Sequence, residues 1–110
     1  MTEKYVRGGF VAILVSPGFG AGWSTWANDG VEAEKRMFSP ELVHAVLTKT
    51  NKVEILAIAK RLFPDFPDVY HGGVEDLVVE WIPEGTLFRI NEYDGNETVE
   101  LFDASNHYKA

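Results

Sequence analysis

The sequence contains no cysteine among its 110 residues. Disulfide bonds, thiolate metal ligands and cysteine nucleophiles are therefore excluded. The sequence also lacks any run approaching the ~20 apolar residues that a membrane-spanning helix needs, and Met1–Tyr5 does not begin a secretion signal. We therefore expect a protein of the cytosol.

Basic residues are scarce, because ten lysines and arginines stand against 17 aspartates and glutamates, for a net charge of −7. A negative charge of this size disfavours contact with anionic lipid or with the phosphates of nucleic acids. The basic residues are also scattered, so that none of them forms a stripe along which a phosphate backbone could lie. We expect no direct nucleic-acid binding and no membrane binding, whereas a basic protein surface remains a suitable partner.

The composition is otherwise that of a small globular domain, with 45 % apolar residues and no internal repeat, so we expect one domain over residues 1–110. The apolar run at 10–16 is too short for a helix and is typical of a buried strand. Further strands are predicted at 77–82, 86–93 and 96–102. The last two are joined by Asp94-Gly95, a strong hairpin signal. A two-residue turn would place Glu92 opposite Glu97 and Arg89 opposite Glu100.

Two helices are predicted between the first and second strands. Ser39 suits an N-cap and Pro40 the first helical position. Asn51, with Glu54 three residues later, resembles a capping box for a helix over 52–63. The segment 31–38 fits either a helical turn or an edge strand. The sequence therefore predicts an α+β fold, with a mostly antiparallel sheet of about four strands in the order β-α-α-β-β-β and a helical pair on one face.

The segment after the first strand combines glycines, hydroxyls and aromatic rings. Glycines allow a ligand to approach the backbone closely, and successive free amides form a nest for an anion. Aromatic rings offer flat faces to a base. We therefore predict a binding site for a nucleotide-type ligand or a protein partner at Gly18, Phe19, Gly20, Gly22, Trp23, Ser24, Thr25 and Trp26. No lysine follows the glycines, so this is no P-loop. The alternative is a tight surface loop whose tryptophans hold it against the core.

Two further places could complete this binding site. Tyr70 and His71 lie in a second glycine-containing loop, which we expect to form another wall. Arg89 and Asn91 are the best-placed polar groups on the face of the predicted hairpin that points away from the core, where they could contact an anionic ligand or a partner. A cross-strand ion pair between Arg89 and Glu100 is the competing structural interpretation.

A catalytic alternative rests on three other side chains. Facing carboxylates at Glu92 and Glu97 cost stability unless something compensates, and such a pair could act as general acid and base or hold a metal ion. His71 could act as a base. A solvated hairpin tip explains the same carboxylates without chemistry. We predict no catalytic residue, no metal site and no cofactor, and keep as the alternative a small hydrolase or nucleotide-modifying enzyme that uses His71 with Glu92 or Glu97.

Three sequence blocks resemble a family of small uncharacterised proteins from tailed bacteriophages. The blocks are LVSPGFGAGWSTW at 14–26, VYHGG at 69–73 and FRINEYDGNE at 88–97, and the resemblance covers most of the chain. It carries over no catalytic residue. It implies an accessory protein of the host bacterial cytoplasm that counters a host defence or redirects a host factor.

Three classes of function are consistent with these observations. The preferred one is a non-enzymatic phage accessory protein that binds a nucleotide-type signalling ligand or a host defence protein. A homo-oligomer would help it to form a deep pocket. The small enzyme described above is the second class. A structural component of the virion is the third, and it is less attractive because the sequence has no repeat or extended arm.

Overall fold

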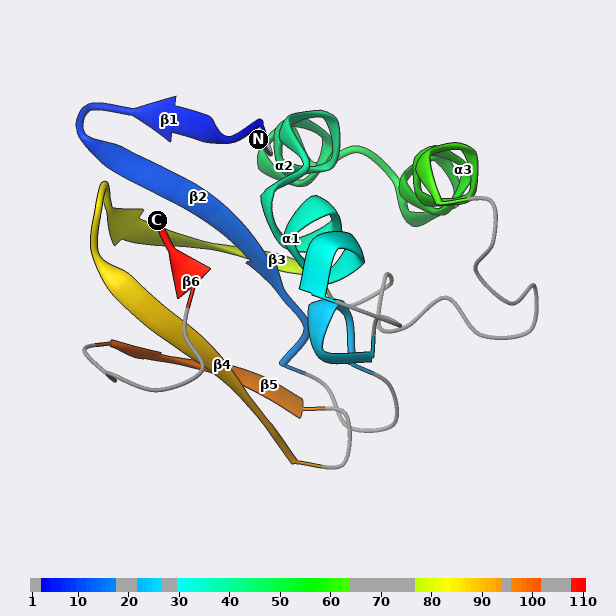
Figure 1. The fold of residues 1–110 in the computed structure, drawn as a ribbon. Coiled ribbons are helices and arrows are strands. Elements are labelled where there is room, and N and C mark those ends of the chain that lie inside the picture. Colours follow the sequence, from blue (N-terminus) through cyan, green and yellow to red (C-terminus); the bar gives the residue numbers. More distant parts are fainter. Residues whose placement is uncertain (1–2, 18–21, 27–29, 64–76, 94–95, 102–107) are drawn as a thin grey trace.

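The computed structural model describes residues 3–17, 22–26, 30–63, 77–93, 96–101 and 108–110. The described strands are β1 (Tyr5–Arg7), β2 (Phe10–Val15), β3 (Val78–Pro83), β4 (Leu87–Tyr93), β5 (Asn96–Leu101) and β6 (Tyr108–Lys109) (Figure 1). The described helices are α1 (Gly30–Phe38), α2 (Pro40–Leu47) and α3 (Lys52–Leu62), together with a short 3₁₀ helix, η1 (Ser24–Trp26). The fold is therefore α+β, as predicted. None of the described helices has the length and apolar character needed to cross a membrane.

The described strands form two antiparallel sheets, which we name sheet A (β1-β2-β3) and sheet B (β5-β4-β6). The antiparallel pairing and the helical pair match the prediction, but two three-stranded sheets replace the expected single sheet of about four strands. Sheet A gains β1 because Gly8 and Gly9 adopt φ values of 57° and 84°, which turn the chain back and pair Tyr5 with Ala12. At the other end of β3, Gly85 adopts φ 85°, and β4 then begins the second sheet.

Strand β2 contributes to two cores, one on each face of sheet A. Val11, Ile13 and Val15 pack with α1 and with residues of sheet B. Ala12 and Leu14 face the opposite way and pack with residues of α2 and α3. Figure 1 shows β2 with α2 and α3 on one side and the strands of sheet B on the other. Because both faces of β2 are covered, its sequence is continuously apolar instead of alternating.

The helix ends follow the capping residues found in the sequence. The Ser39 hydroxyl accepts a hydrogen bond from the Leu42 amide at 3.3 Å, and the Asn51 side chain accepts one from the Glu54 amide at 2.9 Å. The ambiguous segment 31–38 is helical, within α1. Because this segment is helical, the side chains of Arg36, Met37 and Phe38 at the end of α1 are buried.

The β4–β5 hairpin has the predicted register, with Glu92 opposite Glu97 and Arg89 opposite Glu100. Its turn residues, Asp94 and Gly95, lie outside the described residues. At the start of β5, the Glu97 amide donates to the Ser16 carbonyl at 2.7 Å. This bond joins sheet B to the end of β2, where the glycine-rich segment begins.

Candidate functional site

The carboxylate of Glu97 holds the chain on both sides of the glycine-rich segment. One oxygen accepts from the Ser16 amide at 3.0 Å. The other accepts from the Trp23 amide at 2.7 Å, from the Thr25 amide at 3.0 Å and from the Thr25 hydroxyl at 2.6 Å. Glu97 is only 1 % exposed. A carboxylate that accepts several hydrogen bonds from backbone amides can remain buried in its charged form. We call these four residues the Glu97 anchor.

The Glu97 anchor changes the interpretation of the loop. An anion-binding nest was predicted from the sequence, and the described amides of Trp23 and Thr25 do bind an anion, which is the chain's own Glu97. The Thr25 hydroxyl is used in the same way. Gly22 and Ser24 are buried beside them. These groups would have to leave Glu97 before they could bind the phosphate of a ligand.

Trp23 belongs to the core, because it is 1 % exposed. Its indole Nε1 donates to the Arg36 carbonyl at 2.7 Å, while the Arg36 guanidinium donates to the Trp23 carbonyl at 3.1 Å. The guanidinium also lies 5.6 Å from the Trp23 ring centroid, in cation–π geometry. The predicted contact between the Trp23 ring and a ligand needs an exposed ring face, and the buried Trp23 ring has none. The alternative interpretation of the loop, in which tryptophan holds it against the core, describes Trp23 correctly.

Arg36 is a buried cation that links the loop to α1. It is 2 % exposed and pairs with Glu32 at 2.9 Å, one helical turn earlier. Burial lowers the pKa of Arg36, and the carboxylates of Glu32 and Glu97 oppose that shift. Because an arginine stays protonated across the physiological range, the cation neutralises part of the buried negative charge of Glu97. The i, i+4 spacing of Glu32 and Arg36 was the signal in the sequence that could have found this pair.

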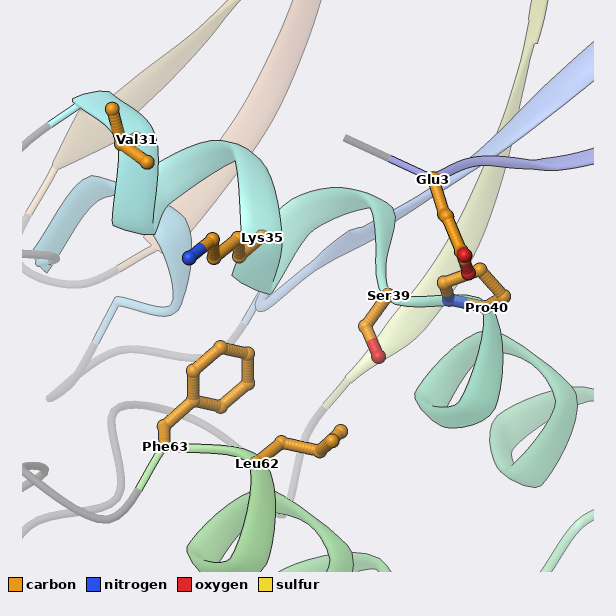
Figure 2. A pocket seen from close by; sticks show the side chains of 7 residues that line it. All are labelled: Glu3, Val31, Lys35, Ser39, Pro40, Leu62 and Phe63. Atoms are coloured by element: carbon orange, nitrogen blue, oxygen red, sulfur yellow. The ribbon is translucent and has the colours of Figure 1, made fainter. Parts of the chain in front are cut away.

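Phe63 lines a cleft, and its ring also meets the buried Trp23 ring edge-on at a centroid distance of 5.8 Å. The cleft has a volume of about 340 Å³, and we call it the α1–α3 cleft. Figure 2 shows Lys35 of α1 above the Phe63 ring, with Glu3 beside Pro40 at the other end. Its lining residues come from the N-terminus, α1, the start of α2 and the end of α3: Glu3, Val31, Lys35, Ser39, Pro40, Leu62 and Phe63.

Arg89 and Asn91 are both occupied by one carboxylate. The Arg89 guanidinium reaches the Glu100 oxygens at 3.2 and 3.3 Å, and the Asn91 side-chain amide donates to Glu100 at 2.6 Å. The predicted ion pair across the hairpin is thus present. Arg89 and Asn91 are not among the described residues that line the α1–α3 cleft.

The carboxylate pair at Glu92 and Glu97 does not form a solvated hairpin tip. Glu92 is exposed and Glu97 is buried, although the two residues are opposite in the register. The difference arises because Glu97 enters the interior to meet the loop amides, and both its oxygens are then occupied. Glu97 is therefore not positioned as an accessible acid–base partner of Glu92. Within the described part of the chain, no group of three or more acidic or histidine side chains could hold a metal ion.

Several predicted site residues lie outside the described residues. They are Gly18, Phe19 and Gly20 of the glycine-rich segment and Tyr70 and His71 of the second loop. For Trp26 the described part is the backbone, which belongs to η1.

Comparisons of the chain with family models, with curated proteins and with solved structures found no match.

Proposed function

We propose that this chain is a non-enzymatic phage accessory protein that holds a host protein, such as a defence factor, at the α1–α3 cleft. The phage context comes from the resemblance of the three sequence blocks. The binding role is supported by the cleft, which is open beside α1 and has mostly apolar walls. Contiguous apolar surface beside a cleft is characteristic of interaction sites.

The cleft is better suited to a protein side chain than to a phosphate. Val31, at its edge, is 64 % exposed, and Leu62 and Pro40 add further apolar surface. Its two charged residues, Lys35 and Glu3, form no ion pair within the described residues. An apolar side chain of a partner can fill the cleft while polar groups around it pair with Lys35 and Glu3. The carboxylate of Glu3 at one end would disfavour a ligand with several phosphates.

One observation above all carries the proposal. The loop amides that were expected to bind a small anion are taken by Glu97, whereas an apolar cleft stands open against the buried Trp23–Phe63 pair. A preformed wall of this kind reduces the cost of ordering side chains on binding. The protein-binding interpretation is therefore the better supported of the two that the sequence left open.

The test compares two exposed valines. Val31→Glu places a charge at the edge of the cleft, and Val53→Glu places the same charge on α3, at a residue that is 78 % exposed and does not line the cleft. Affinity capture from phage-infected bacteria, quantified by mass spectrometry, should enrich one host protein with wild type and Val53→Glu. The Val31→Glu variant should capture at least about tenfold less. Equal capture by both variants, or no enriched protein, would refute the proposal.

A further inference from the structure

A second surface lies at the far end of sheet A, on the face whose other end is covered by α2 and α3. The register places Tyr5 and Trp81 on either side of Ala12, and Arg7 and Pro83 on either side of Phe10. Ala12 and Phe10 lie two and four positions from Leu14 along β2, so all three face the same side of the sheet. Their partners on β1 and β3 point to that side too. The rings of Tyr5 and Trp81 meet edge-on at 6.1 Å across the small Ala12.

Arg7 is held on these rings. Its guanidinium carbon lies 5.5 Å from the Tyr5 centroid and 5.3 Å from the Trp81 centroid, and one nitrogen donates to the Tyr5 hydroxyl at 2.7 Å. Contact with two rings and a hydroxyl fixes the plane of the guanidinium before any ligand arrives.

Arg7 also differs from the other arginines of the chain. Arg36 pairs with Glu32, Arg61 with Glu41 and Arg89 with Glu100. Arg7 has no carboxylate partner within the described residues, although the chain carries 17 acidic residues. A fixed and exposed guanidinium that keeps free donors is suited to bind an anion.

An exposed ring stands next to this cation. Phe10 is 45 % exposed, and together with Arg7 and Trp81 it lines an open hollow of about 400 Å³. We call these three residues the Arg7 surface, and none of the described residues that line it also lines the α1–α3 cleft. Aromatic rings and arginine planes are the groups on which bases stack in single-stranded recognition.

We propose that the Arg7 surface binds a mononucleotide, with its base stacked on Phe10 and Trp81 and its phosphate paired with Arg7. Because Arg7 lies beside the rings of Phe10 and Trp81, the surface is suited to a ligand that is both flat and anionic. An inorganic anion would contact only the cation, and an apolar group would contact only the rings. A long polyanion is disfavoured, since Arg7 is the one cation among the described residues that line the hollow and the chain has a net charge of −7. This site is independent of the protein partner proposed above.

The proposal is tested by titrating the full chain with the four common ribonucleoside 5′-monophosphates while following amide and indole signals by NMR. At least one should saturate, and the largest shifts should fall at Arg7, Phe10 and the Trp81 indole. Adenosine and inorganic phosphate, each carrying one half of the recognition, should bind at least about tenfold more weakly than the best monophosphate.

Three variants locate the binding. Arg7→Gln and Phe10→Ala should each weaken it by about tenfold, and Arg7→Lys should fall between wild type and Arg7→Gln because it keeps the charge and loses the planar fork. Val6→Ala is the matched control, because Val6 is exposed on the same strand but on the opposite face, and it should change affinity by less than about twofold. No saturation by about 10 mM nucleotide, or equal affinity in wild type and Arg7→Gln, would overturn the proposal. Host-protein capture through Val31 is a separate readout, so failure of one leaves the other standing.

Discussion

The Glu97 anchor and the Arg7 surface both bring a charged side chain to groups from distant parts of the sequence, but only one of them is already satisfied. Glu97 is buried, and its oxygens are filled by the amides of Ser16, Trp23 and Thr25. Arg7 is exposed, stacked on two rings and without a carboxylate among the described residues. Charged side chains can thus have opposite fates: Glu97 is buried by hydrogen bonds from the chain itself, whereas Arg7 stays exposed on two rings at the end of a β-hairpin.

The largest expected effect comes from removing the carboxylate at the Glu97 anchor. Glu97→Ala leaves three backbone amides and the Thr25 hydroxyl without their acceptor and leaves buried Arg36 less compensated. We expect a loss of about 3–5 kcal/mol in the free energy of unfolding, measured by urea denaturation. Glu92→Ala, opposite in the register but exposed, should cost no more than about 0.5 kcal/mol. Similar losses for both variants would contradict the difference in burial.

A smaller effect is expected at the indole that the anchor places in the core. Trp23→Phe removes the hydrogen bond to the Arg36 carbonyl and leaves space in a fully buried position, so it should cost about 1–3 kcal/mol in the free energy of unfolding. Trp81→Phe is the matched control at a half-buried site, and thermal unfolding should show a smaller loss there. An equal or greater loss at Trp81 would mean that the Arg7 surface serves stability more than recognition.

The cross-strand pair of Arg89 and Glu100 should contribute less again. The side chains of Arg89 and Glu100 are 34 % and 44 % exposed, so water screens their attraction. A double-mutant cycle with Arg89→Ala and Glu100→Ala should give a coupling of about 0.2–1 kcal/mol that shrinks as salt is added. A coupling of several kcal/mol, unaffected by salt, would show that this pair is not the weak surface bridge we describe.

The smallest effect on stability is expected at the Arg7 surface itself. Arg7→Gln removes an exposed side chain whose described contacts are one hydroxyl and two rings, so the free energy of unfolding should change by no more than about 0.5–1 kcal/mol. Chemical denaturation of this variant beside Glu97→Ala compares the two regions directly. A loss at Arg7 as large as that at Glu97 would remove the contrast.

Local signals predicted much of the fold. Asp94-Gly95 gave the hairpin register, Ser39-Pro40 gave the start of α2, and the unbroken apolar run gave the buried strand β2. These features depend on residues close in sequence, where turn geometry, capping and periodicity act. The Gly8-Gly9 pair carries the same kind of signal for the β1–β2 hairpin, although β1 is absent from the strands predicted above.

The candidate sites depended on pairings that no local pattern contains. Glu97 accepts hydrogen bonds from amides more than 70 residues earlier in the chain. These hydrogen bonds determine whether the carboxylate at the start of β5 is buried or solvated. The Arg7 surface requires β1 and β3 to flank β2 in one register, which brings Trp81 beside residues near the N-terminus. Such contacts follow from topology, so residue types alone could not predict that Glu97 accepts hydrogen bonds from the loop amides or that Arg7 lies on the rings of Tyr5 and Trp81.

Amide hydrogen exchange at Trp23 and Thr25 tests most directly whether the loop is held by the chain's own carboxylate. In wild type both amides should exchange as slowly as amides in the centre of β2, with no change on adding phosphate, and in Glu97→Gln both should exchange much faster while those of β2 stay protected. Rapid exchange of both amides in wild type, slowed by added phosphate, would contradict the account and restore the loop as an open anion site.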